Sequence, residues 1–180
     1  PVEMVFHPEA NLVEMLLSPA RISTEQDRAA GELAKRTIEA FDICGLLAVE
    51  MFLTNTGELL INEVAPRPHN SGHHTIEGNA TSQFEQHLRA ILDLPLGDPG
   101  VVRPAAMVNI LGAEGHHGPA FYRDVRAALE MEGVYPHIYG KAHTRPFRKM
   151  GHFTITGPDV ASVLQKTREV EALARVYTKG

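Results

Sequence analysis

The residues with the clearest chemical potential are concentrated in the segment INEVAPRPHNSGHHT, residues 61–75. The segment holds a glutamate, an arginine, two prolines and three histidines, which is unusual for a surface loop. A short apolar run precedes it and a helical pattern follows it. Carboxylates, arginine and imidazole are groups that bind metal ions and oxyanions, so we expect a site at the end of a strand.

The glutamate of this segment has a partner in the preceding strand. Two strand patterns, LLAVEMFL and GELLINEV, flank TNTG, which is a good hairpin turn. A register with Leu53 opposite Glu58 places Glu50 and Glu63 on one side of the sheet as diagonal neighbours, with Cα atoms about 7–8 Å apart. Asn62 points to the opposite face in that register.

Two carboxylates on one face of a sheet are costly unless a cation neutralises them. Mg²⁺ suits Glu50 and Glu63, because it accepts few protein carboxylates and takes its other ligands from water and phosphate oxygens. The alternative is that this face is solvent and both glutamates are simply exposed. The following loop favours the metal, because Arg67 can bind an oxyanion through two parallel donors and His69 and Asn70 add neutral donors.

Zinc is a second interpretation of the same region. His69, His73 and His74 lie close together in the sequence, and His116 and His117 form another pair. His69 and His73 are four residues apart, but they stand in a predicted loop rather than on a helix, and no Cys-His spacing is present. The pattern therefore favours Mg²⁺ and phosphoryl or acyl-phosphate chemistry.

Patterns elsewhere predict the framework that positions these residues, and the predicted class is α+β. Besides the hairpin, strand patterns are VEMVF, NLVEMLLSP, AAMVNILG, PHIYGK and RKMGHFTITG. Helical patterns cover residues 25–41, 82–92 and 119–131, and a last helix begins near Asp159. Ser23 and Gln26 have capping-box spacing at the first helix.

The stretch LPLGDPGVVRP, residues 94–104, is rich in proline and glycine and is the best candidate for a linker. We therefore expect two domains, residues 1–97 and 98–180. The net charge of −5 argues against nucleic acid as a main partner. No apolar run approaches the roughly 20 residues of a membrane span. A single cysteine, Cys44, excludes an internal disulfide, which favours a reducing compartment, the cytoplasm. Cys44 stands in an apolar stretch and is expected to be buried.

The central motif GLLAVEMFLTNTGELLINEVAPRPHNSGHHTIEG resembles the ATP-grasp enzymes of purine synthesis, most closely the family of 5-(carboxyamino)imidazole ribonucleotide synthases. The ending HNSGHHT favours this family over the formate-dependent glycinamide ribonucleotide transformylases, where an aspartate is expected after the histidine. YGKAHTRPFRKMGH resembles the C-terminal domain of the family. The resemblance implies that residues 1–97 are part of the large ATP-grasp lobe, mainly antiparallel sheet with flanking helices, and that 98–180 form a small β-rich domain.

The resemblance also implies roles for the residues of the loop. Glu50 and Glu63 would hold the Mg²⁺ ions that bridge the phosphates of ATP, with Asn62 beside them as a further cofactor-binding residue. Arg67, His69 and Asn70 would hold bicarbonate and the carboxyphosphate made from it, and would therefore be the catalytic residues.

A basic cluster stands out in the C-terminal part of this acidic protein. By the resemblance, Lys141 and Arg148 would reach the phosphate of the ribonucleotide, and Arg145 is a further substrate-binding candidate beside Lys149. The alternative is that these cations form the solvated edge of a strand pair. The spacing from Lys141 favours Arg148 over its neighbours.

The implied activity is that of an ATP- and Mg²⁺-dependent ligase, which carboxylates 5-aminoimidazole ribonucleotide with bicarbonate in purine biosynthesis. A homodimer is implied as well. Alternatives are another ATP-grasp ligase, a glycinamide ribonucleotide transformylase, or a non-catalytic binding domain. Enzymes of this family are roughly twice as long, and their N-terminal and ATP-clamping domains have no counterpart in the sequence. We therefore expect the 180-residue chain alone to be inactive.

Overall fold

The computed structural model describes residues 1–6 and 13–179, and they form two compact units. The first unit consists of Pro1–Glu3 and Ser18–Val102, and the second consists of Met4–Leu17 and Arg103–Gly180. The predicted domain limits, 1–97 and 98–180, remain a prediction. Each unit is described by itself.

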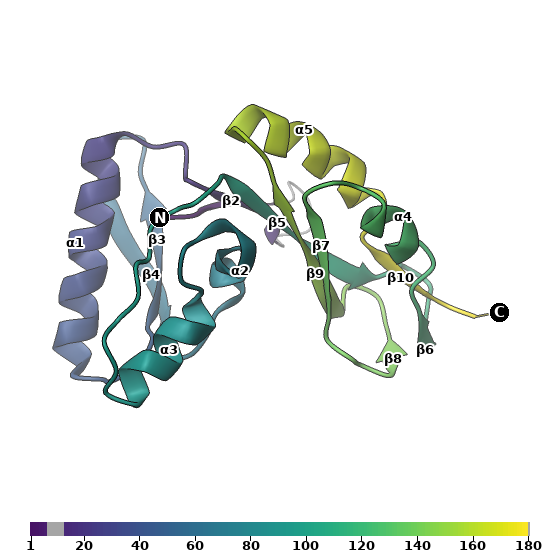
Figure 1. Cartoon of the computed structure of the whole chain (residues 1–180), viewed down its shortest axis with the longest axis horizontal. Helices are drawn as coiled ribbons and strands as arrows, with labels where there is room; N and C mark the ends of the chain where they lie inside the picture. Colours follow the sequence, from purple (N-terminus) through teal and green to yellow (C-terminus); the bar gives the residue numbers. More distant parts are fainter. Residues whose placement is uncertain (7–12, 180) are drawn as a thin grey trace. The chain divides into compact units, whose positions relative to one another are not determined.

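The first unit contains a long helix, a hairpin and three short helical segments (Figure 1). The elements are α1 (Thr24–Phe41), β3 (Ala48–Leu53), β4 (Leu59–Ala65), the 3₁₀ helix η1 (Asn70–Gly72), α2 (Thr75–Gly78) and α3 (Gln83–Ile91). Strands β3 and β4 pair only with each other among the described residues, and α1 packs against β3.

The predicted capping box at α1 is confirmed. The side chain of Ser23 accepts a hydrogen bond from the main chain of Gln26, whose side chain accepts one from Ser23. Glu25 and Asp27 in the first turn are favourable beside the positive end of the helix dipole. The helix ends at Asp42, which has a left-handed backbone with φ of 49°.

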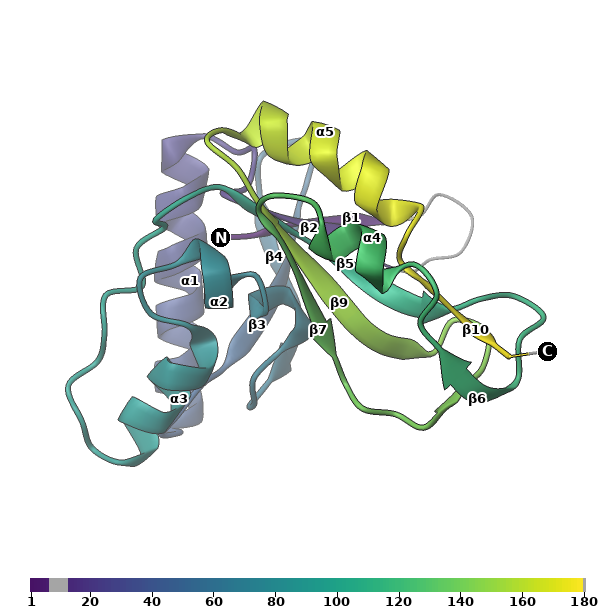
Figure 2. The same cartoon turned by 45° about the vertical axis from the view of Figure 1, so that its right-hand side comes forward.

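The second unit contains one large, mainly antiparallel sheet with two helices (Figures 1 and 2). Its strands are β1 (Glu3–Phe6), which crosses the division between residues 3 and 4, then β2 (Val13–Ser18), β5 (Ala105–Gly112), β6 (Gly118–Phe121), β7 (Val134–Ile138), β8 (His143–Thr144), β9 (Lys149–Thr156) and β10 (Arg175–Thr178). Its helices are α4 (Val125–Leu129) and α5 (Val160–Glu171). One path of pairing runs β1-β2-β5-β10-β6-β8, while β9 joins β5 to β7.

The core of the second unit lies between the β5–β9 pair and α5. Val108 pairs with Phe153 and Ala106 pairs with Ile155, so alternate residues of both strands face the same side. Val163 of α5 belongs to the same fully buried cluster. Both views show α5 running along this sheet (Figures 1 and 2). The predicted α+β class with a mainly antiparallel sheet is therefore confirmed.

Most of the predicted strands and helices are present, with one clear exception. The predicted helix over 119–131 is wrong, because Gly118–Phe121 forms strand β6 and only Val125–Leu129 is helical. Strand β6 pairs with β10 and β8, which are far away in the sequence and were not predicted. The first residues of the predicted strand NLVEMLLSP, 11 and 12, lie outside the described residues.

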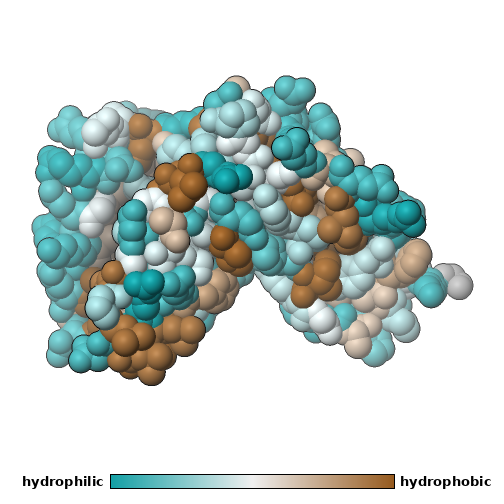
Figure 3. All heavy atoms as spheres, in the orientation of Figure 1, coloured by the Kyte–Doolittle hydropathy of each residue, from teal (hydrophilic) through white to brown (hydrophobic). Residues whose placement is uncertain are grey.

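Apolar side chains are exposed on α3 and the segment after it. Figure 3 shows them as brown spheres gathered over this part of the first unit. The exposed residues here are Leu88, Ile91, Leu92, Leu94 and Leu96.

Cys44 is exposed, so its predicted burial is wrong. Its thiol donates to the carbonyl of Ala90 at 3.2 Å.

Candidate functional site

The hairpin brings Glu50 and Glu63 directly opposite each other, and the predicted diagonal arrangement is wrong. Two local features cause the difference. The turn holds three residues between Thr54 and Glu58, with Gly57 at φ of 84°, so Leu53 pairs with Leu59. A bulge then follows, in which Asn62 is the extra residue.

Each feature shifts the pairing by one residue, and together they shift it by two. Because the side-chain period of a strand is two, the pair of glutamates stays on one face of the sheet. Asn62 is exposed at the bulge, and a bulge is a feature that can re-aim a side chain relative to a regular ladder. The inference that the two carboxylates share a face was correct, but the distance between them was overestimated.

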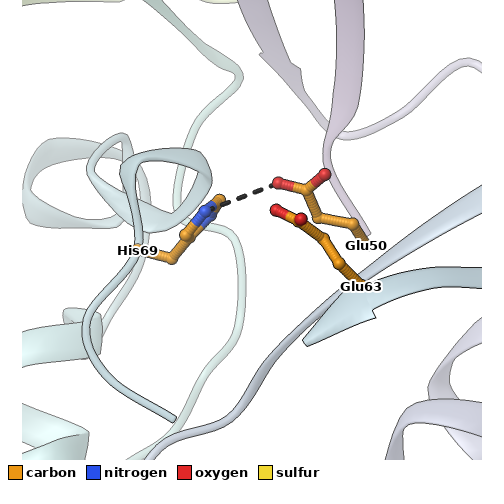
Figure 4. A group of neighbouring side chains, drawn as sticks. All are labelled: Glu50, Glu63 and His69. Carbon is orange, nitrogen blue, oxygen red and sulfur yellow. Dashed lines mark ion pairs between the residues drawn. The ribbon is translucent and has the colours of Figure 1, made fainter. Parts of the chain in front are cut away.

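A third side chain, that of His69, faces this pair from the loop after β4 (Figure 4). One potential ligand atom from each of Glu50, Glu63 and His69 lies within 4.8 Å of the others. The Nε2 atom of His69 is 3.4 Å from Oε1 of Glu50. The Glu50 and His69 side chains are only 18% and 14% exposed, whereas Glu63 is exposed. Two carboxylates are therefore gathered at a spot partly screened from water.

The hydrogen bonds of the imidazole determine which nitrogen of His69 carries the proton. The main-chain N–H of Ser71 donates to Nδ1 of His69 at 3.3 Å, and the Ser71 hydroxyl is 2.9 Å from the same nitrogen. A main-chain N–H can only donate, so Nδ1 is an acceptor, and in the neutral ring the proton is on Nε2. This N–H is directed at Glu50. His69 therefore presents its one N–H to the carboxylate of Glu50, 3.4 Å away.

This set of donors fits a hard cation such as Mg²⁺ better than zinc. The carboxylate oxygens of Glu50 and Glu63 are the ligands that Mg²⁺ prefers, whereas the Nε2 proton of His69 would have to leave before this nitrogen could bind a metal. His73 and His74, which the zinc interpretation used, do not belong to this group among the described residues.

His73 and His74 have structural surroundings that the sequence did not indicate. His74 is buried, and its Nδ1 donates to the carbonyl of Ser71 at 2.9 Å. Burial lowers the pKa of this imidazole below its ordinary value, which favours the neutral ring. His73 stacks on Phe84, with ring centroids 5.6 Å apart. Nδ1 of His73 is 2.9 Å from Nε2 of Gln83. Sequence reasoning missed Gln83 altogether.

The other predicted residues of the loop lie beside this group. Arg67 is exposed, and its Nη1 donates to the carbonyl of Pro68 at 3.2 Å. Asn70 is the first residue of η1 and is half-buried. Their predicted role in binding an oxyanion stays a prediction.

The basic cluster belongs to the second unit and is described separately. The Lys141 ammonium donates to the carbonyl of Lys149 at 2.5 Å and lies 5.6 Å from the ring centroid of Tyr139. Arg148 donates from Nη1 to the carbonyl of His143 at 2.6 Å. Both cations are half-buried, whereas Arg145 is exposed. Lys141 is thus anchored to the main chain of β9 and Arg148 to that of β8. Their predicted contact with a phosphate stays a prediction.

Two models of known protein families match this chain. Residues 3–84 match the ATP-grasp domain, and residues 105–166 match the phosphoribosylaminoimidazole carboxylase C-terminal domain. The chain belongs to the ATP-grasp family, and within it to the group that carries this C-terminal domain. The predicted family resemblance is therefore confirmed.

Individual relatives support the same placement. The chain is 47% identical over 156 residues to the chloroplastic phosphoribosylaminoimidazole carboxylase of Vigna aconitifolia, covering 85% of this chain and 28% of that protein. It is similar to the crystal structure of N5-carboxyaminoimidazole ribonucleotide synthetase from Thermotoga maritima, with a TM-score of 0.89 and 48% identity over 92% of this chain and 46% of that one.

A third relative is the Aspergillus clavatus N5-carboxyaminoimidazole synthase in complex with ADP and 5-aminoimidazole ribonucleotide. The TM-score is 0.84 and the identity 36%, over 96% of this chain and 46% of that one. The chain therefore spans less than half the length of these relatives.

Proposed function

We propose that this chain is part of a ligase that carboxylates 5-aminoimidazole ribonucleotide with bicarbonate, using ATP and Mg²⁺. The observation that carries the proposal is the group of Glu50, Glu63 and His69, built on a bulged hairpin in a chain of the ATP-grasp family. The named activities of the relatives and the ADP and ribonucleotide bound to one of them support it.

The chemistry has two steps. An oxygen of bicarbonate attacks the γ-phosphorus of ATP, and ADP leaves, which yields carboxyphosphate. The exocyclic amine of the ribonucleotide then attacks the carboxyl carbon, phosphate leaves, and the amine nitrogen loses a proton.

In this proposal the residues of the first unit bind the reacting anions. Glu50 and Glu63 would hold Mg²⁺, with Asn62 beside them, and the charge of the ion would neutralise that of the transferring phosphoryl group. Arg67 would bind bicarbonate through its two parallel donors, and His69 and Asn70 would donate to carboxyphosphate. The neutral His69 ring has a single N–H, on Nε2, which faces Glu50 in this structure, so donation to carboxyphosphate would replace that contact.

In the second unit, Lys141 and Arg148 would bind the phosphate of the ribonucleotide. Both are half-buried, and hydrogen bonds to the main chain restrict their side chains, so less conformational freedom is lost when a phosphate binds. Arg145 is exposed and is the weaker candidate.

The proposal is tested in the full-length enzyme by the substitution Glu63→Gln. Turnover with ATP, bicarbonate and aminoimidazole ribonucleotide should fall by at least about 100-fold, because one metal ligand loses its charge. The matched control is Glu58→Gln, an exposed glutamate in the turn of the same hairpin, which should stay within about twofold of wild type. Unchanged turnover in Glu63→Gln would favour a non-catalytic binding domain.

The acceptor substrate is tested separately. Phosphate release by the full-length protein should require aminoimidazole ribonucleotide and bicarbonate. Release that requires glycinamide ribonucleotide and formate would assign the chain to a transformylase on the same scaffold.

Two further proposals concern the full-length protein: a homodimer, which the family resemblance implies, and a location in the cytoplasm, which the single cysteine favours. Sedimentation of the full-length protein tests the first, and fractionation of cells tests the second. Within residues 1–6 and 13–179, no helix is long and apolar enough to cross a membrane.

A further inference from the structure

Gln83, the first residue of α3, contacts the loop that carries His69 through three hydrogen bonds. Its side chain is almost completely buried. The main-chain N–H of His69 donates to Oε1 of Gln83 at 2.9 Å, and Nε2 of Gln83 donates to the carbonyl of His69 at 2.8 Å. The third contact joins Nε2 of Gln83 to Nδ1 of His73 at 2.9 Å.

The orientation of this side-chain amide is determined by its main-chain partners. A main-chain N–H can only donate and a carbonyl can only accept, so Oε1 and Nε2 of Gln83 cannot be exchanged without losing both bonds to His69. The remaining N–H of Gln83 is directed at Nδ1 of His73, which therefore accepts. The oxygen and both N–H groups of the Gln83 amide therefore form hydrogen bonds to the same loop.

The loop and α3 also approach each other very closely. A Cβ atom added to Gly72 would lie 2.5 Å from Oε1 of Gln83, so a larger residue at position 72 would displace the amide. The main chain of Gln83 donates to the hydroxyl of Thr75, which in turn donates to the carbonyl of Gly72. The segment from His69 to Thr75 is thus bonded to the first residue of α3 along its length.

We propose that Gln83 is a positioning residue for the candidate metal site. It holds the main chain of His69 at both of its polar groups, while Ser71 holds the ring, and together they direct Nε2 of His69 at Glu50. This inference rests on the proposed function of that site. Gln83 does not belong to the group formed by the two glutamates and His69, and acts only through His69.

The same helix offers a matched control in Gln86. Its Nε2 donates to the carbonyl of Gly97 at 2.6 Å, and its Oε1 accepts from the N–H of Gly97 at 2.9 Å. Gln86 therefore makes the same pair of main-chain bonds as Gln83, from the same helix, to a segment that carries no predicted site residue. Loss of either glutamine removes the same kind of contact, but only one loss affects His69.

The experiment compares Gln83→Met and Gln86→Met in the full-length enzyme, by steady-state kinetics with each substrate varied. Gln83→Met should lower kcat about 10- to 100-fold and raise KM for bicarbonate about tenfold, as is typical when a partner that orients a metal-site residue is removed. KM for aminoimidazole ribonucleotide should change less than about twofold, since its predicted phosphate contacts lie elsewhere, and Gln86→Met should leave all three constants within that range.

Equal effects of the two substitutions would overturn the proposal, as would a loss of kcat in Gln83→Met with unchanged KM for bicarbonate. The latter result would show that bicarbonate binding does not depend on Gln83, and a smaller amount of folded enzyme would produce it as well. If Gln83→Met does not fold, Gln83→Glu decides by the same constants, because it keeps the acceptor for His69 and removes both donors.

A readout without turnover separates this proposal from the proposed function. The ¹⁵N resonances of the His69 ring should report a proton on Nε2 in wild type and a mixture of tautomers in Gln83→Met. If the wild-type enzyme does not use aminoimidazole ribonucleotide, the proposed function fails, and an unchanged His69 tautomer in Gln83→Met would still overturn the positioning role of Gln83.

Discussion

The two units of the molecule are stabilised in different ways. In the second unit the buried side chains are mostly apolar, and they form one cluster between the β5–β9 pair and the two helices. In the first unit, the only buried apolar side chain among the described residues is that of Ala30. Its other large apolar residues are half-buried or exposed, while its buried side chains are those of Ser18, His74, Thr81 and Gln83.

This difference places the candidate metal site on a framework of hydrogen bonds and the basic cluster beside an apolar core. Hydrogen bonds are directional, so they determine which atom of His69 faces Glu50. Each typical one contributes only about 1 kcal/mol to net stability, far less than a large buried apolar side chain. We therefore expect the second unit to be the more stable of the two and the first to be the more sensitive to single polar substitutions.

The largest expected effect concerns two phenylalanines on strands. Phe153 of β9 is fully buried and Phe52 of β3 is 55% exposed. Phe153→Ala should lower the free energy of unfolding of the second unit by about 3–5 kcal/mol, because it opens a cavity in the core. Phe52→Ala should cost the first unit less than about 1 kcal/mol, as for an exposed position.

Hydrogen exchange of main-chain amides measures both effects in the same 180-residue chain. The four tyrosines, Tyr122, Tyr135, Tyr139 and Tyr177, all lie in the second unit, so tyrosine fluorescence during urea unfolding gives an independent value for that unit. A loss in Phe52→Ala as large as that in Phe153→Ala would contradict the difference between the two units.

A smaller effect is expected at the basic cluster, where the site lies beside the apolar core. In the full-length enzyme, Arg148→Met should raise KM for aminoimidazole ribonucleotide about tenfold, since a hydrogen bond to a charged group contributes about 1.5–3 kcal/mol. Lys141→Met should act similarly. Arg145→Met is the matched control and should change KM less than about twofold, because Arg145 is exposed.

Steady-state kinetics at saturating ATP and bicarbonate provide these constants. A larger effect of Arg145→Met than of Arg148→Met would exchange their roles. Unchanged KM in all three variants would mean that the cluster is a solvated edge of the strand pair.

The contrast between the units also explains what could be predicted from the sequence. Strand β5 was predicted with its exact limits, because a continuous apolar run is typical of a buried strand. The helix predicted over 119–131 was wrong, because β6 is formed by pairing with β10, about 57 residues later, and local patterns carry no information on such pairing.

The candidate site shows the same limit at smaller scale. The alternation of the hairpin was enough to place Glu50 and Glu63 on one face, but the three-residue turn and the bulge at Asn62 could not be read from the pattern. Gln83 was missed because two of its three partners are main-chain atoms of His69, 14 residues away, and any residue has such atoms. The positions of chemical groups were predictable where they follow strand periodicity, and not where they follow side-chain bonds to the main chain.

The smallest expected effect is an opposite response of the two units to mild acid. In the first unit, burial lowers the pKa of His74 below its ordinary value of 6.5. In the second unit, burial and the charge of Glu14 raise the pKa of Glu171 above 4.5. The unfolded chain therefore binds the His74 proton more readily than the folded unit does, and the reverse holds for Glu171.

The signs follow from these shifts. The stability that His74 contributes is complete above pH 6.5 and is lost as the pH falls through this value towards the lowered pKa of the folded unit. The ionised Glu171 disfavours folding at neutral pH, and this penalty disappears as the pH falls through its raised pKa. Between pH 7 and pH 5 the first unit should lose stability while the second changes little or gains.

NMR peak intensities of α1 and β9 amides during urea unfolding at pH 7.0 and 5.5 would measure the two responses in one sample. His74→Gln, which cannot titrate and can still donate to the carbonyl of Ser71, should remove most of the loss in the first unit and leave the second unchanged. If the first unit of His74→Gln is still weakened by acid as strongly as wild type, the sensitivity has another source. Among the described residues of the first unit, Glu3 also has a lowered pKa, because its carboxylate is bonded to the Arg21 guanidinium. Protonation of Glu3 would weaken the unit only below pH 4.5.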